Sequence, residues 1–305
     1  MIKKQSTVKI AVLTFNRAEK LSILLKSLIS QTYPNWEAIV FDNCSTDNTE
    51  LTVSSLQDGR ISYIKNEKNI GGCGNIEKAY NFCRANSDFF ALLHDDDVLS
   101  PQWLYESLKL FLNDQAIVLA ATNSWYLGRK PFQRRTFYKD TSGVVYLSDP
   151  KQLALWMMRN NSLCFPTILY KANAAPQIQF ENKKTFDVKL YLEVATNGKC
   201  AVLLKPLFYY RVHPMQDSNY IPTVDIDWID AILSQIIEPK NRCDFRVERD
   251  YLSRRWLQKY RAVAKSDTLL TRISRIRHAL KNGRLSWSSY DGRHKIRILL
   301  TLGGL

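Results

Sequence analysis

Residues 8–50 read "VKIAVLTFNRAEKLSILLKSLISQTYPNWEAIVFDNCSTDNTE". The first eight residues form a short, β-branched, apolar run that is typical of a buried strand, and residues 18–31 repeat apolar side chains at helical spacing. Asn16 is placed to cap that helix. A second strand is expected over residues 36–42, before a turn-rich helix start. The stretch therefore predicts a strand–helix–strand unit.

The same alternation continues to about residue 121. Further strands are expected over 61–65, 89–93 and 116–121, a glycine-rich loop over 66–75, and helices over 76–86 and 101–112. Strands that alternate with helices indicate a Rossmann-like α/β fold, with a mostly parallel central sheet and helices on both faces.

The second half of the chain has a less regular pattern. Residues 123–146 are aromatic and basic, which fits a hairpin or a loop. Gly198 is a candidate C-cap for the helix before it. From residue 222 the chain turns helical. Between these segments we expect a helix over 150–159, a strand over 164–171, a helix over 186–198, and one or two strands over 199–213.

Composition fits a soluble protein with one large domain plus an appendage, or with two domains. The chain has 305 residues, of which 45% are hydrophobic and 24% charged. No apolar run approaches the roughly 18–20 residues that cross a membrane. The six cysteines are scattered, without a C-x-x-C pair, so we expect neither a zinc site nor a disulfide framework. With no signal-like apolar segment at the N-terminus, we expect a cytoplasmic protein.

Positive charge is concentrated near the C-terminus. Residues 241–305 hold 16 of the 43 Lys and Arg but 5 of the 29 Asp and Glu. Basic amphipathic helices bind anionic membrane surfaces, so this region could dock the protein peripherally on the inner face of the cell membrane. A helical subdomain with a solvated basic face explains the pattern equally well.

Polar side chains follow the expected strands where each strand ends. Thr14 and Asn16 follow the first strand, Asp42 ends the second, and three aspartates, residues 95–97, follow the fourth. Ligands of parallel α/β sheets gather at this edge. Carboxylates bind hard cations such as Mg²⁺ or Mn²⁺, which would offset their mutual repulsion. If the segment is extended, Asp95 and Asp97 point one way and Asp96 the other. The alternative is a solvated turn that caps the next helix.

The motifs around these residues resemble the inverting family 2 glycosyltransferases, which have the GT-A fold. The family theme is a strand ending P-T-Y-N, then Q-x-Y-x-x-W/F-E, a strand ending in Asp, and S-x-D-x-T. Residues 8–50 keep this theme nearly intact apart from the proline, which is Leu13 here, and Phe15 stands at the position of the tyrosine. Residues 69–75, "NIGGCGN", resemble the N-x-G loop, and residues 92–104, "LLHDDDVLSPQWL", resemble the D-x-D segment. The resemblance covers roughly residues 7–218.

The resemblance implies a role for each matching residue. Phe15 would lie against the nucleotide base, Asp42 would hydrogen-bond it, and Asp95 would face the ribose or the metal. The expected metal ligands are Asp96, the last Asp of the D-x-D, together with His94, which replaces its first Asp, and His213, from the R-x-H segment. Packing explains either histidine about as well. Main-chain contacts at Leu13 and the loop residue Asn69 complete the expected nucleotide site.

Inverting transfer needs a general base for the acceptor hydroxyl. The family places an Asp at the start of a late helix, often as E-D, and Asp187 matches it although Phe186 replaces the Glu. A helix N-terminal role favoured by the helix dipole is the plain alternative. The implied catalytic domain spans 1–220, with a nucleotide-sugar half over about 1–122 and an acceptor half over 123–220. Residues 221–305 would form the basic helical region.

We therefore expect a metal-dependent inverting glycosyltransferase of surface polysaccharide synthesis: O-antigen, capsule or lipooligosaccharide. Its cofactor would be Mn²⁺ or Mg²⁺. Its donor would be a UDP-sugar first, with GDP- and dTDP-sugars as alternatives, and its acceptor a glycan or an undecaprenyl-diphosphate-linked glycan. A sugar nucleotidyltransferase and a nucleic-acid-binding protein acting through the basic tail remain alternatives. A dinucleotide-binding oxidoreductase is excluded, because no glycine follows the first strand.

Overall fold

The computed structural model describes residues 6–127, 136–158, 163–179 and 186–212. The chain divides into two compact units, residues 1–153 with 163–221 and residues 154–162 with 222–305. The sheet lies in the first unit. His213 and the basic region fall outside the described residues, so the expectations for them stay predictions, as does the domain boundary at residue 220.

The N-terminal part of the sheet is parallel and follows the predicted alternation. Strand β1 pairs with β2 on one side and with β4 on the other, and β2 pairs with β3. All four strands therefore end at the same edge. Their bounds are Val8–Thr14 for β1, Trp36–Asp42 for β2, Ile61–Lys65 for β3 and Phe89–His94 for β4.

Beyond β4 the sheet becomes mixed, and its order is β3-β2-β1-β4-β8-β6-β9-β5, with β7 also paired to β9. Strand β8 is antiparallel to both β4 and β6, whereas the longer pairing of β6 with β9 is parallel. Strands β5 and β7 both run antiparallel to β9. The bounds are Val98–Leu99 for β5, Ile117–Leu127 for β6, Val144–Leu147 for β7, Leu169–Lys171 for β8 and Lys199–Arg211 for β9.

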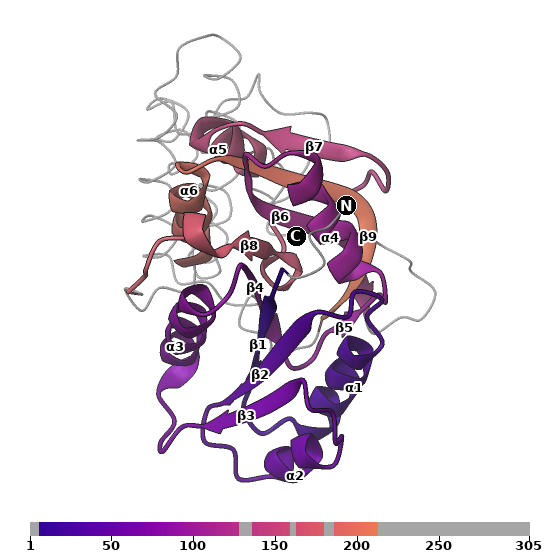
Figure 1. The fold of residues 1–305 in the computed structure, drawn as a ribbon, viewed down its shortest axis with the longest axis vertical. Coiled ribbons are helices and arrows are strands. Elements are labelled where there is room, and N and C mark those ends of the chain that lie inside the picture. The colour runs from indigo at the N-terminus through magenta and orange to yellow at the C-terminus, as the bar shows by residue number, and fades with distance from the viewer. Residues whose placement is uncertain (1–5, 128–135, 159–162, 180–185, 213–305) are drawn as a thin grey trace, which may run out of the picture. The chain divides into compact units, whose positions relative to one another are not determined.

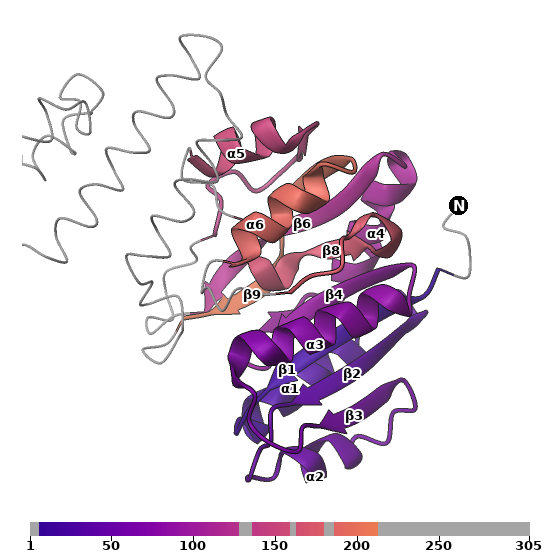
Figure 2. The same cartoon turned by 90° about the vertical axis from the view of Figure 1, so that its left-hand side faces the viewer.

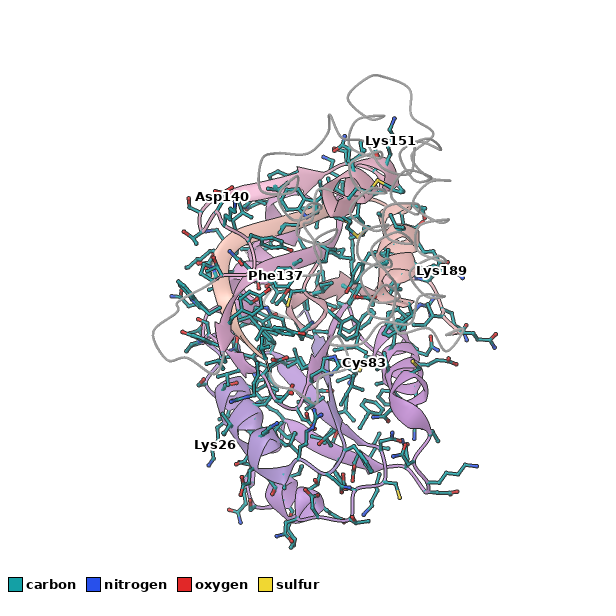
Figure 3. The ribbon with its side chains drawn as sticks, turned by 180° about the vertical axis from the view of Figure 1, so that it is seen from behind. Lys26, Cys83, Phe137, Asp140, Lys151 and Lys189 are labelled. Atoms are coloured by element: carbon teal, nitrogen blue, oxygen red, sulfur yellow. The ribbon has the colours of Figure 1, made fainter. Side chains whose placement is uncertain are left out.

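Helices cover both faces of the sheet. Figure 1 shows α3 and α6 on one side of the strands and α1 and α4 on the other, and Figure 2 turns α3 and α6 toward the viewer. Figure 3 labels Cys83 on α3 and Lys189 on α6 from behind. The helices are α1 Ala18–Ile29, α2 Thr49–Ser54, α3 Gly71–Ala85, α4 Trp103–Asn113, α5 Pro150–Met158 and α6 Phe186–Ala195, with 3₁₀ turns η1 Phe165–Thr167 and η2 Ala172–Ala174.

The predicted periodicity of α1 corresponds to its buried face. Leu21, Leu24, Leu25 and Leu28 follow the i, i+3, i+4, i+7 spacing, and all are fully buried. Each such side chain contributes about 1.5–3 kcal/mol relative to exposure. The same core includes apolar side chains of β1, β2 and β4. This packing holds α1 against the sheet.

The glycine-rich segment differs from the predicted loop. Helix α3 begins at Gly71, five residues before the expected start, so the whole "GGCGN" run lies within the helix. Gly71 has φ +77°, in the left-handed region that favours glycine. The glycines predicted a loop because glycine weakens helices, but here the side chain of Asn75 hydrogen-bonds the Phe41 carbonyl at 2.9 Å and holds the first turns against β2.

Gly198 is needed for close approach rather than as a left-handed C-cap. Its φ is not in the left-handed region, and helix α6 ends at Ala195. A Cβ at position 198 would lie 2.4 Å from the main-chain oxygen of Ala116, where β6 begins. The predicted C-cap is therefore wrong, and glycine is required because β6 and the start of β9 meet there.

Two other segments also differ from the expectation. The expected strand over 164–171 starts instead as the 3₁₀ turn η1, which contains Pro166, and only Leu169–Lys171 joins the sheet. In the irregular region, β6 continues to Leu127 and β7 covers Val144–Leu147. The α/β fold class is nevertheless confirmed, with a large sheet between helices whose longest strand pairings are parallel. Among the described residues, no helix is both long and apolar enough to cross a bilayer.

Candidate functional site

The ends of β1, β2 and β4 bring the predicted polar residues together. Thr14 lies opposite Asp42 in the β1–β2 register, and Leu13 lies opposite His94 in the β1–β4 register. The three aspartates follow directly after β4, and all are buried: Asp95 is 2%, Asp96 8% and Asp97 1% exposed. Three carboxylates buried side by side need donors or cations around them.

Asp95 is held by donors from the end of β1. The Thr14 hydroxyl donates to Oδ2 at 2.8 Å, and the Phe15 N–H donates to the same oxygen at 3.4 Å. The guanidinium of Arg17 donates to Oδ1 at 3.0 Å. Burial raises the pKa of Asp95, while the charge of Arg17 and the Thr14 hydrogen bond act in the opposite direction.

Arg17 also reaches the second aspartate, and the sequence reasoning missed it. Its Nη1 lies 3.5 Å from Asp96 Oδ2, so one nitrogen contacts a carboxylate oxygen of each residue. The signal that could have identified it is its place three residues after the end of β1, at the edge where the aspartates gather.

Asp97 points away from this pair, toward the end of β9. Its Oδ1 accepts the N–H of Arg211 at 2.9 Å, and Nε of Arg211 donates to the main-chain oxygen of Asp96 at 2.7 Å. Its Oδ2 is buried without a hydrogen-bond partner among the described residues. Burial raises the pKa of Asp97 well above its usual range, and the neighbouring carboxylates Asp96 and Asp95 add to that rise.

The expected alternation of the three side chains is wrong. Residues 95 and 96 form a turn rather than an extended strand, and Asp95 and Asp96 therefore both face Arg17 while Asp97 does not. The helix-cap alternative is not what the structure has either. Helix α4 has Gln102 at its N-cap position, without a side-chain cap hydrogen bond in the described part of the chain.

Asp42 is fully buried at the end of β2, with both oxygens engaged. Oδ1 accepts the N–H of Ser45 at 3.0 Å and its hydroxyl at 2.5 Å. Oδ2 accepts the hydroxyl of Tyr63 from β3. Burial and the hydrogen bond to this carboxylate raise the pKa of Tyr63. The structure shows how Asp42 is positioned, and its contact with a base stays a prediction.

The S-x-D-x-T motif joins the first two loops of this edge. The Asn16 N–H donates to Ser45 Oγ at 2.8 Å, and its side-chain oxygen accepts the Thr46 N–H at 2.8 Å. Asp47 accepts the N–H groups of Ala18 and Thr49, at the starts of α1 and α2. Asn16 has φ 53° and does not cap α1, so the predicted cap is wrong; Asp47 serves that helix end from the neighbouring loop.

The remaining nucleotide-site residues differ in exposure. Phe15 is 42% exposed at this edge, and its ring can meet a ligand, whereas the side chain of Leu13 is buried in the sheet. Asn69 Oδ1 accepts Asn43 Nδ2 at 2.9 Å and the Gly71 N–H at 2.8 Å. Asn69 therefore shapes the start of α3, and a direct contact with a ligand stays a prediction.

Aromatic rings connect the aspartate turn to the start of α6. The His94 ring lies 5.5 Å from that of Phe165, and Phe165 lies 5.8 Å from Phe186. The next residue, Asp187, is partly buried and accepts the Tyr191 hydroxyl at 3.4 Å. Burial raises the pKa of Asp187 to about 6. It is thus a carboxylate at neutral pH that still binds a proton readily.

The donor set of the turn fits a cation that is shared with a ligand. Mg²⁺ and similar ions are usually held by one or two carboxylates together with substrate phosphates, and Asp95 and Asp96 supply such a pair. Among the described residues, no group of three or more His, Cys, Asp and Glu could hold a metal by itself. A closed protein cage is therefore not formed by these residues, and metal ligation by His94 stays a prediction.

Comparisons with known proteins place this edge in a family context. The model of glycosyl transferase family 2 matches residues 9–175. WcaA of Escherichia coli K12, a glycosyl transferase assigned to colanic acid biosynthesis, is 33% identical over 187 residues, which cover 56% of this chain and 64% of WcaA. The β-1,3-glucosyltransferase WfgD of E. coli is 33% identical over 103 residues, covering 34% of this chain and 38% of WfgD. Both matches span less than two thirds of the relative's length.

A solved structure supports the fold over a longer stretch. The crystal structure of S. aureus TarS 1–349 in complex with UDP-GlcNAc superposes with a TM-score of 0.62, covering 86% of this chain and 76% of that chain at 17% identity. At that identity the likeness concerns the fold. With the family model matching more than half of the sequence, this chain belongs to glycosyl transferase family 2.

Proposed function

We propose that this protein transfers a sugar, with inversion, from a nucleoside-diphosphate sugar to a hydroxyl of a glycan or lipid-linked glycan in surface polysaccharide synthesis. The observation that carries the proposal is the buried turn of Asp95 and Asp96 at the carboxyl edge of the sheet. Support for the substrates comes from relatives: the name of WfgD gives UDP-Glc as donor and α-D-GlcNAc-diphosphoundecaprenol as acceptor. A UDP-sugar is therefore the first donor to test.

The donor end of the site is built from β1 and β4. The exposed ring of Phe15 offers an apolar face for the base. Arg17 supplies positive charge beside Asp95 and Asp96, where a diphosphate would lie. A divalent cation held by Asp96, and in part by Asp95, would neutralise charge on the departing nucleoside diphosphate.

The acceptor end needs a base, and Asp187 is suited to it. The acceptor oxygen attacks the anomeric carbon, the bond from that carbon to the diphosphate oxygen breaks, and the hydroxyl proton passes to the Asp187 carboxylate. With its pKa raised to about 6, Asp187 is ionised at pH 7 yet more basic than an ordinary aspartate. The ring contacts between His94, Phe165 and Phe186 connect the helix that carries this base to the donor turn.

The proposal extends to where the enzyme works. A lipid-linked acceptor lies at a membrane, and residues 241–305 carry a strong excess of Lys and Arg. Each basic residue near an anionic surface contributes about 1 kcal/mol of attraction. We place the enzyme in the cytoplasm, docked peripherally on the inner face of the cell membrane through this region.

The test is calorimetric titration with UDP, GDP and dTDP, each with Mn²⁺ and with EDTA. One nucleotide should bind tightly with Mn²⁺, and Asp96→Asn should remove most of the metal-dependent gain. Asp114→Asn is the matched control. Asp114 pairs with Lys199 where β6 and β9 start, at the edge of the sheet opposite the aspartate turn. No binding of any nucleotide in either condition would reject the proposal.

The released product distinguishes the proposed glycosyltransferase from a sugar nucleotidyltransferase, the second candidate function. Incubation with donor and an acceptor extract should release a nucleoside diphosphate if a sugar is transferred. Pyrophosphate release from a sugar phosphate and a nucleoside triphosphate would support a sugar nucleotidyltransferase instead.

A further inference from the structure

We propose that Arg17 is a built-in counter-cation of the diphosphate site, which holds Asp95 and Asp96 in place before the donor arrives and competes with a divalent cation for them. In consequence, metal binds weakly to the protein alone and binds well only with a nucleotide that draws Arg17 onto its phosphates. This inference rests on the proposed nucleotide-diphosphate function and assigns Arg17 as a positioning residue within it.

The position of Arg17 is set by the turn that precedes it. Asn16 is held in the left-handed region by its links to Ser45 and Thr46 in the loop after β2. Arg17 then occupies the N-cap position of α1, and its main-chain oxygen accepts the Leu21 N–H at 3.0 Å. Its backbone is therefore anchored at both ends, and the side chain leaves this rigid turn toward β4.

The contacts of Arg17 are those a bridging cation would make. One nitrogen, Nη1, lies 3.0 Å from Asp95 Oδ1 and 3.5 Å from Asp96 Oδ2. The other oxygen of Asp95 accepts the Thr14 hydroxyl and the Phe15 N–H, so both oxygens of this carboxylate already have a donor without metal. A metal on Asp95 Oδ1 or Asp96 Oδ2 would lie beside the guanidinium, and the repulsion between the two positive charges makes them compete for these oxygens.

Exposure makes that exchange feasible. The Arg17 side chain is 35% exposed, while the side chains of Asp95 and Asp96 are 3% and 10% exposed. The carboxylates cannot rearrange freely within the packed turn, but the guanidinium can move outward while its backbone stays in place. Arg211 does not neutralise the Asp95 and Asp96 carboxylates in the same way, because its Nε donates to the main-chain oxygen of Asp96 rather than to a carboxylate.

Two binding measurements of opposite sign test the proposal. Mn²⁺ binding to the full-length protein without nucleotide is followed by electron paramagnetic resonance, and UDP binding in EDTA by calorimetry. Arg17→Met should tighten Mn²⁺ binding by about 3–10-fold, the factor expected when a partly exposed ion pair of roughly 0.7–1.4 kcal/mol no longer competes. The same substitution should weaken metal-free UDP binding by a similar factor. Arg17→Lys, which keeps the charge, should stay close to the unsubstituted protein in both.

Arg60→Met is the matched control. The Arg60 side chain is also 35% exposed and pairs with Asp58 at 2.7 Å, before β3, so the variant loses the same charge elsewhere. It should leave both affinities unchanged. If Arg17→Met unfolds, Arg17→Gln serves in its place, and thermal unfolding of each variant establishes that it is folded.

The outcomes separate this inference from the proposed function. Unchanged or weaker Mn²⁺ binding by a folded Arg17→Met protein overturns the counter-cation role, since a merely structural residue would weaken both ligands together. Failure of the unsubstituted protein to bind any nucleotide rejects the proposed function, and the Mn²⁺ comparison still decides whether Arg17 competes for the carboxylates.

Discussion

Replacing Asp187 with asparagine should stabilise the folded protein at pH 8 while removing its activity. The aspartate is partly buried, and burial raises its pKa from 3.8 to about 6. The folded protein therefore binds this proton more tightly than the unfolded chain does. For this group, stability is highest below the unfolded pKa and is lost as the pH rises through the folded pKa. The asparagine side chain carries no charge, so the variant avoids that loss.

The magnitude follows from the shift. About two pKa units correspond to roughly 3 kcal/mol as an upper bound, and partial exposure of the side chain lowers the expected gain to about 1–2 kcal/mol. Asparagine has the same shape and keeps an oxygen for the Tyr191 hydroxyl, so no packing loss offsets the gain. Since asparagine cannot accept the hydroxyl proton, transfer should slow by about 10²–10⁴-fold.

The assay combines urea unfolding at pH 4 and pH 8 with the pH dependence of transfer. The difference in unfolding free energy between variant and unsubstituted protein should be near zero at pH 4 and grow by pH 8. The transfer rate of the unsubstituted enzyme should fall about tenfold per pH unit below pH 6. Asp114→Asn is a control that should change stability in the opposite direction. The hydrogen bond from Lys199 lowers the pKa of Asp114, so its ionised form favours the folded protein and the asparagine variant should be less stable at pH 8. An Asp187→Asn protein that is less stable at pH 8, or that retains its rate, would refute the reasoning.

Three further predictions concern the edge of the site, the sheet and the tail. Tyr63→Phe leaves Oδ2 of buried Asp42 without its donor, so urea unfolding should show a loss of about 1–3 kcal/mol. Gly198→Ala forces a Cβ within 2.4 Å of a main-chain oxygen and should lower the free energy of unfolding by about 1–3 kcal/mol. Gly59→Ala, whose Cβ would meet no described atom within 4 Å, should leave that free energy nearly unchanged. Equal losses in the two variants would contradict the close approach of β6 and β9 at Gly198. Deletion of residues 241–305 should abolish sedimentation with phosphatidylglycerol vesicles, and unchanged sedimentation would reject the docking role.

The fold was predictable wherever packing followed local periodicity. The apolar spacing of α1 and the β-branched runs of β1 and β2 define the strand–helix–strand unit, and the structure confirms it. Prediction failed where a tertiary contact overrides local propensity. Helix α3 extends through glycines that weaken helices by themselves, because the Asn75 side chain ties them to Phe41 of β2.

In the candidate site too, some features followed from the sequence and others were set by tertiary contacts. The sequence by itself determined that Thr14, Asp42 and the aspartates would meet, since parallel strands joined by helices end at one edge. Only the tertiary structure decided which cation and donors face each carboxylate. Arg17 meets Asp95 across 78 residues of chain, and Tyr63 meets Asp42 from a neighbouring strand. Such pairings depend on strand register and on a turn that breaks the two-residue alternation, and neither leaves a local pattern in the sequence.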